Sequence, residues 1–222
     1  MKSFQRTTRE MMKEHFDTHY KKAFDSQAAP SFTVVHAKSA MEKGDESFKQ
    51  KLYLKAAIEY RDSTRAPAYL FDAYYKLGLC AKNFRAHSML HISGIDKFKF
   101  YPLENREALS LNDAAAIFFR EALALFPDFN DAEFASKRRP VNPNLSEVIY
   151  QLSMCISKGA QIHPIDLVNT RFEESSPQTI NSKELEKALL ERVVLINPGH
   201  HEANEKLKRS SPDLGLKIGV IH

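Results

Sequence analysis

The sequence predicts an all-α fold in which helices stack in pairs, and three observations support this. Only 7 glycines occur among 222 residues, too few for the many tight turns of an all-β fold. Apolar residues recur at helical spacing along most of the chain. The chain also resembles itself, because residues 75–80 align with 150–155 and residues 119–127 align with 190–198. One helix pair cannot bury its apolar face alone, so repeated helical segments predict a stacked array.

The N-terminal half contains four helical patterns. Residues 4–24 place an apolar or aromatic residue at almost every fourth position, which predicts one amphipathic helix. A second helix is expected after Ser31, with Gly44 at its C-terminal end. We expect a third helix over residues 47–64 and a longer one over residues 69–91. One face of the third helix carries four apolar residues: Phe48, Leu52, Ala56 and Tyr60.

The C-terminal half contains further helical patterns with clear start and stop signals. We expect helices over residues 114–126, 145–158, 182–196 and 202–208. Asn112 and Asp113 precede the first of these as capping residues, and Ser182 is the expected N-cap of the third. Gly159 follows the second and should end it.

These patterns divide the chain into three parts. Residues 1–30 form the N-terminal amphipathic helix, residues 31–208 form a helical repeat domain, and residues 209–222 form a C-terminal tail. Within the domain, residues 92–112 and 160–182 are less regular. We interpret these two segments as inserts between the paired helices, with longer helices as the alternative.

Small and large residues repeat in the same order in the paired segments. The first helices carry Tyr74, Leu77, Gly78 and Ala81, and then Ile149, Leu152, Ser153 and Ile156. The second helices carry Ala115, Phe119, Ala122 and Pro127, and then Leu190, Val193 and Pro198. A weaker N-terminal unit has Ala56 and Tyr60, with Pro67 one residue early. This pattern resembles the tetratricopeptide repeat (TPR) family.

The resemblance implies a right-handed α-solenoid of about three TPR-like helical hairpins, preceded by the N-terminal amphipathic helix. The small residues allow two helices to approach closely, and the large ones fill the space between neighbouring hairpins. The chain departs from the family in its spacing. In the family's unit the small residue of the first helix lies twelve residues before the Ala of the second. Gly78 to Ala115, and Ser153 to Glu186, are each longer by about twenty to twenty-five residues. A helical bundle outside the family is the alternative.

The resemblance also implies a function, namely a protein–protein interaction scaffold or adaptor. In that family the first helices line a concave groove that binds a peptide or helix of a partner. The residues expected to face this groove are Tyr69, Asp72, Tyr75, Lys76, Leu79, Tyr150, Gln151 and Met154. Some TPR proteins hold a chaperone's C-terminal carboxylate with Lys, Asn and Arg. Only Lys76 of that set is matched here, with Gln151 at the equivalent place, so we do not predict this ligand.

The sequence shows little sign of catalysis, and we expect neither an enzyme nor a cofactor or metal site. Cys80 and Cys155 occupy equivalent repeat positions among apolar residues, which predicts buried packing residues rather than nucleophiles. His15 with His19, and His87 with His91, are helical pairs that would need a third ligand to bind zinc. An enzymatic or metal-dependent domain built on the two inserts is the alternative function.

Charge and hydropathy restrict the partners further. The net charge is +4, but basic residues are mixed with acidic ones, and the one short cluster spans residues 137–139. We therefore do not expect nucleic-acid binding, although a nucleic-acid-associated helical repeat is a second alternative. No signal peptide or membrane-spanning stretch is recognisable, so we expect no membrane association and a cytoplasmic location. The oligomeric state stays open.

Overall fold

The computed structural model describes residues 31–93, 110–125, 144–160 and 182–210, and every regular element in these ranges is a helix. The predicted all-α class is confirmed for this part of the chain. The α-helices in chain order are α3 (Ser31–Lys49), α4 (Tyr53–Ser63), α5 (Leu70–Ala81), α6 (Ala86–Ser93), α7 (Leu111–Ala124), α9 (Leu145–Ser157), α10 (Ser182–Ile196) and α11 (His201–Ser210). A short 3-10 helix, η2 (Pro67–Tyr69), leads directly into α5.

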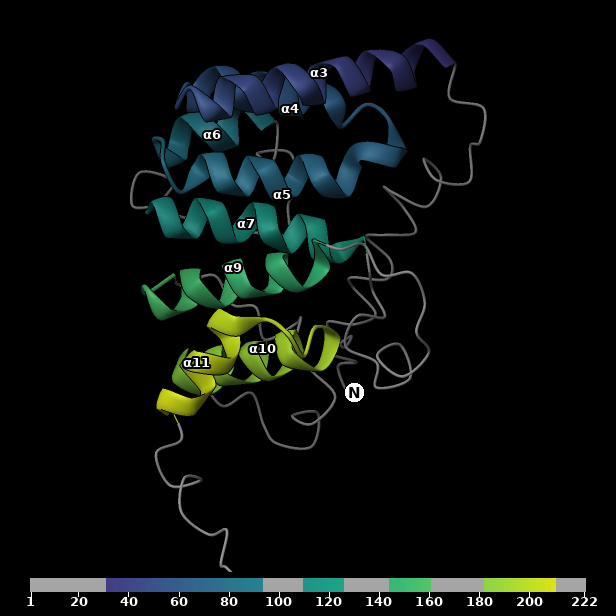
Figure 1. Ribbon diagram of the computed structural model, residues 1–222. Coiled ribbons are helices and arrows are strands. Elements are labelled where there is room, and N and C mark those ends of the chain that lie inside the picture. The colour runs from purple at the N-terminus through teal and green to yellow at the C-terminus, as the bar shows by residue number, and fades with distance from the viewer. Residues whose placement is uncertain (1–30, 94–109, 126–143, 161–181, 211–222) are drawn as a thin grey trace, which may run out of the picture.

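The helices pack one after another in the order of the sequence (Figure 1). α3 lies against α4, α4 against α5, α5 against α7, and α7 against α9. The series continues as α10 packs against α9 and α11 packs against α10. α6 departs from this order because it contacts both α4 and α7. One continuous apolar core results, and it extends from Met41 on α3 to Ala203 on α11.

Gly44 does not end a helix, and that prediction is wrong because α3 continues to Lys49. Gly44 is buried, and a Cβ atom added to it would lie 2.4 Å from Cε1 of Tyr60 on α4. No side chain fits at that distance, so glycine is present here for close helix approach rather than for a turn. The predicted helix over residues 47–64 is correspondingly two elements, the end of α3 and all of α4.

The chain leaves α3 through Lys51, which follows the last helical residue by two positions and has a φ of 60°. The Lys51 amide donates to the Phe48 carbonyl and the Leu52 amide donates to the Ser47 carbonyl, which is the bonding pattern of a Schellman cap. Lysine occupies the left-handed position that glycine usually takes. The sequence therefore carried no stop signal, and this is why the boundary was misplaced.

The shared face predicted for four residues of the third helix holds only for two of them. Ala56 and Tyr60 are buried on α4 as expected. Leu52 is 47% exposed in the turn before α4, and Phe48 lies on α3. The Phe48 ring still packs edge-on against Tyr53, with centroids 5.5 Å apart.

The helix predicted over residues 69–91 is also two helices. α5 ends at Ala81 and α6 begins at Ala86. Asn83 ends α5 by donating its side-chain amide to the Leu79 carbonyl at 2.9 Å, which satisfies an acceptor that the next helical turn would otherwise bond. Neither glycine nor proline marks this break. The helical spacing of apolar residues continues through it, and for this reason the sequence predicts one helix.

α7 begins with a capping box formed by Ser110 and Asp113. The Ser110 hydroxyl accepts from the Asp113 amide at 3.1 Å, and the Asp113 carboxylate accepts from the Ser110 amide at 3.0 Å. Ser110 is therefore the N-cap, two residues before the predicted Asn112. The seven consecutive residues 113–119 are all buried, so α7 is enclosed on all sides along this stretch.

The C-terminal helices agree closely with the prediction. α9 covers Leu145–Ser157, and Gly159 follows it with a φ of 87°, a left-handed conformation that glycine adopts readily. Ser182 is the first residue of α10 rather than its N-cap. α11 begins one residue before, and ends two residues after, the helix predicted over residues 202–208.

Several predictions concern residues outside the described ranges. These are the N-terminal helix and the 1–30 division, most of the inserts near 92–112 and 160–182, the basic cluster at 137–139, and the tail from residue 211. Within the described residues, no helix is both long and apolar enough to cross a membrane.

Candidate functional site

The eight residues predicted to face a partner lie on η2, α5 and α9, and they are exposed to a similar extent. Tyr69 ends η2, four of the residues lie on α5, and three lie on α9. All eight are partly buried. The residues between them, such as Leu77 and Leu152, are fully buried in the core. We call the partly buried set the α5–α9 surface: Tyr69, Asp72, Tyr75, Lys76, Leu79, Tyr150, Gln151 and Met154.

Side-chain hydrogen bonds join α5 to α9 across this surface. Asn144, the N-cap residue of α9, donates from Nδ2 to Oδ1 of Asp72 at 3.0 Å. Near the other end, Lys82 Nζ donates to Oε1 of Gln151 at 2.5 Å. The earlier residue of α5 meets the earlier residue of α9, so the two helices run in the same direction. The surface is therefore made of two like-oriented helices held together by polar contacts.

Lys76 is tied to the neighbouring helix α3. Its ammonium forms an ion pair with Asp45 and lies 5.5 Å from the centre of the Tyr60 ring. Asp45 also accepts a hydrogen bond from the Tyr60 hydroxyl at 2.8 Å. One carboxylate thus connects α3, α4 and α5, and the charge of Lys76 is balanced within the protein.

Tyr75 and Tyr150 are the two aromatic residues near the middle of the surface. The Tyr75 ring lies 6.3 Å from that of Phe119 on α7. Burial, together with the smaller effects of the Glu147 and Asp72 carboxylates, raises the pKa of Tyr75 to about 12. Burial also raises the pKa of Tyr150, with Glu202 the largest of its nearby charges. Both phenols stay protonated at neutral pH and can donate hydrogen bonds.

His200 connects α11 to α9 and was not predicted as a site residue. It is 8% exposed, and its ring centroid lies 4.7 Å from that of Tyr150. Nε2 is 3.2 Å from Oε2 of Glu147, while Nδ1 accepts from the Ala203 amide at 3.3 Å. His200 thereby caps the first turn of α11. The sequence offered no signal for this role beyond a histidine at a helix start.

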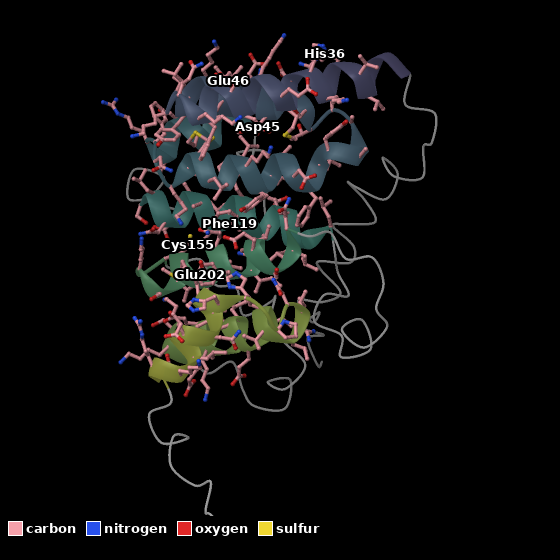
Figure 2. The ribbon with its side chains drawn as sticks, in the orientation of Figure 1. His36, Asp45, Glu46, Phe119, Cys155 and Glu202 are labelled. Atoms are coloured by element: carbon pink, nitrogen blue, oxygen red, sulfur yellow. The ribbon has the colours of Figure 1, made fainter. Side chains whose placement is uncertain are left out.

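The polar contacts extend along much of the stack. Figure 2 shows Asp45 on α3 and Glu202 on α11 toward opposite ends of it. Between them, Glu147 accepts from Nε2 of Gln151 at 2.7 Å and contacts His200. Polar side-chain contacts thus link α3 to α5, α5 to α9, and α9 to the residues at the start of α11.

The cysteines are buried as predicted. Burial raises the pKa of the Cys80 thiol to about 12 and that of the Cys155 thiol to about 11, the latter against an opposing effect of Lys82 and Lys158. Both sulfur atoms carry their protons at neutral pH, so they are poor nucleophiles there.

Metal binding has no support in the described ranges, where no group of three or more His, Cys, Asp or Glu residues could hold an ion. His15 and His19 lie outside these ranges. His87 and His91 are on α6, but their side chains are not described.

Comparisons with protein-family models, with curated proteins and with solved structures each found no match to this chain. The geometry of the helices and the residues of the α5–α9 surface are therefore the basis on which function is inferred.

Proposed function

We propose that this chain is a protein-interaction scaffold or adaptor, built as a right-handed α-solenoid of TPR-like hairpins. In this proposal α3 with α4, α5 with α7, and α9 with α10 are the three hairpins, and α11 caps the last one. The helices α3, α5 and α9 then line a concave groove that holds a peptide or a helix of a partner protein.

A recurrent contact supports this assignment. A Cβ added to Gly78 on α5 would lie 2.4 Å from Cε1 of Phe119 on α7, the same distance as between Gly44 and Tyr60. Each pair thus brings a glycine of one helix against an aromatic ring of the next. In addition, Gly44 precedes Ala56 by the twelve residues of the family's uninterrupted unit, which supports the proposal that α3 and α4 form the first repeat.

The observation that carries the function is the composition of the α5–α9 surface. Tyr75 and Tyr150 present partly exposed rings, and Leu79 and Met154 add apolar area beside them. Tyrosine is enriched at protein interfaces because it combines a large apolar contact with a hydrogen-bonding hydroxyl. Methionine adapts its shape to different partners. A surface with these side chains, bordered by polar groups, suits a polypeptide ligand.

Affinity capture with the full chain tests the proposal. The bait with Tyr75→Ala and Tyr150→Ala should lose the proteins that the unaltered chain retains from a lysate, by roughly tenfold or more for hot-spot tyrosines. The matched control carries Lys187→Ala and Glu191→Ala, which remove an exposed ion pair on the outer face of α10. Every captured protein should remain bound to this control.

A second variant guards against loss of fold. Leu79→Gln with Met154→Gln alters the same surface at two other partly exposed positions, and circular dichroism confirms helix content for each bait. If both variants stay folded and keep all the proteins that the unaltered chain captures, the proposed function is wrong.

A further inference from the structure

Three described lysines on or beside the α5–α9 surface are already engaged within the protein. Lys76 forms its ion pair with Asp45. Lys82, at the end of α5, donates to the amide oxygen of Gln151, and Lys206 on α11 pairs with Glu186 at 2.8 Å. These three ammonium groups are therefore occupied in the folded chain.

The carboxylates of the same surface have mainly neutral partners. Asp72 accepts from the Asn144 amide group, and Glu147 accepts from the Gln151 amide group. Amide donors satisfy hydrogen bonding but leave the negative charge in place. Glu202 on α11 is largely exposed, with 66% of its side chain accessible.

His200 contacts Glu147 through Nε2 and Glu202 through Nδ1. While Nδ1 accepts from the Ala203 amide it carries no proton, and a ring that then donates from Nε2 to Glu147 is neutral. Glu202 Oε2 lies 3.5 Å from the same Nδ1 and gains an ion pair only if the ring becomes charged. Among the described residues, Asp72, Glu147 and Glu202 thus place three carboxylates on or beside this surface. The neighbouring Lys82 bonds a neutral amide oxygen.

The two tyrosines lie within this negative region. The pKa of Tyr75 is raised by Glu147 and Asp72, and that of Tyr150 by Glu202 and Glu147, in addition to burial. Asp72 precedes Tyr75 on α5 by three residues, and Glu147 precedes Tyr150 on α9 by three, so each ring lies on the same helix face as a carboxylate. A ring face beside a carboxylate is the arrangement that attracts an ammonium or guanidinium group, through the quadrupole of the ring and the charge together.

We propose that the α5–α9 surface binds a basic segment of its partner protein, with lysine or arginine side chains placed over Tyr75 and Tyr150 and facing Asp72, Glu147 and Glu202. The proposal rests on the proposed function and names the chemistry of the ligand. Charge complementarity selects this occupant, because an acidic peptide or a nucleic acid would be repelled by the same carboxylates.

Selection from a displayed library of random peptides on the immobilised full chain tests this proposal. We expect the selected peptides to contain Lys and Arg at about twice their frequency in the library, and to bind more weakly as salt concentration rises. Their binding should be lost with Tyr75→Ala and Tyr150→Ala.

Isosteric variants then isolate the charge. Asp72→Asn with Glu147→Gln should weaken the selected peptides by about tenfold while circular dichroism stays unchanged. Glu202→Gln, at an exposed position with no packing role, should weaken them by about threefold. The matched control, Glu184→Gln with Glu191→Gln on the outer face of α10, removes the same number of charges and should leave affinity unchanged.

The results of these experiments distinguish the basic-ligand inference from the proposed function on which it rests. The basic-ligand inference is overturned if peptide binding depends on both tyrosines but the peptides show no excess of basic residues. It is also overturned if Glu202→Gln and the Asp72/Glu147 variant leave peptide affinity unchanged. The proposed interaction function stands in both cases. If no peptide is selected, or the selected peptides do not need the tyrosines, both proposals are overturned.

Discussion

α7 and α10 each pack against the helix that precedes them in a pair, but they differ in how much of their surface is buried. α7 is buried on all sides along residues 113–119. α10 buries one stripe, Leu185, Leu189, Leu190 and Val193, and exposes Lys187, Glu191 and Leu195 on the other side. α7 packs against α5, α6 and α9, whereas α10 packs against α9 and α11. The short helix α6 thus covers part of α7 in addition to the contacts that α5 and α9 provide.

The largest effect expected from this difference comes from one polar substitution made in both helices. Ile117→Asn on α7 should lower the free energy of unfolding by about 4 kcal/mol, because Ile117 is 0% exposed and the new amide would lack partners. Leu195→Asn on α10 should change it by less than about 0.5 kcal/mol, since Leu195 is 54% exposed. Urea unfolding followed by circular dichroism measures both. Equal losses would show that α7 and α10 are not buried differently.

A second substitution tests whether α6 contributes to the burial of α7. Met89 on α6 is 0% exposed, so Met89→Ala should cost about 3 kcal/mol through lost burial and the cavity left behind. Met154→Ala on α9, where the side chain is only partly buried, is the comparison and should cost clearly less. The same unfolding measurement applies. A loss at Met89 no greater than at Met154 would mean that α6 contributes little to the enclosure of α7.

The equivalent thiols of α5 and α9 predict a fall in stability at alkaline pH. Their pKa values are raised in the folded chain, from the ordinary 9.0 to about 12 for Cys80 and about 11 for Cys155. Unfolded thiols therefore lose their protons first as pH rises above about 9, and stability present below that pH is lost progressively toward pH 12.

The wild type should lose about 4 kcal/mol more than Cys80→Ala with Cys155→Ala between pH 8 and about 10.5, about 2 kcal/mol for each thiol. The double variant is necessary because burial raises the pKa of Tyr60 and Tyr75 as well and moves stability in the same direction. Identical pH profiles for the two proteins would contradict the burial of the thiols.

The smallest effects on stability are expected when a single methyl group is added to a glycine. Gly78→Ala should cost about 1–2 kcal/mol, because the new Cβ would overlap the Phe119 ring by more than the helix propensity of alanine recovers. Gly199→Ala, where the nearest atom would be 3.5 Å away, is the control and should be neutral. Thermal unfolding resolves the two. No loss at Gly78 would show that α5 and α7 can separate without cost.

The fold class and most helices could be predicted because hydrophobic spacing reports burial directly. The failures have local causes. Gly44 suggested a turn, although its role is contact with Tyr60, and Lys51 adopted the left-handed conformation that glycine normally marks. Asn83 ended α5 through a hydrogen bond that no spacing pattern encodes.

The binding role of the candidate surface stays a prediction. The resemblance to TPR first helices predicts Asp72, Tyr75 and Gln151 as groove-facing, and in the structure all three are partly buried, as residues at the edge of a core stripe are. Periodicity says nothing of partners on other helices, so the bond between Asp72 and Asn144 was not foreseen. His200 was missed for the same reason, since its contact with Glu147 joins residues far apart in the chain.

The two polar bonds between α5 and α9 have a consequence for which sequence changes the protein tolerates. Asp72 with Asn144, and Lys82 with Gln151, fix the relative position of these helices through their own residues and cap positions. Their alignment is consequently specified separately from the chain that joins α7 to α9. A linking segment of different length or composition could be exchanged there by evolution or by engineering, with the two helices still meeting in the same register.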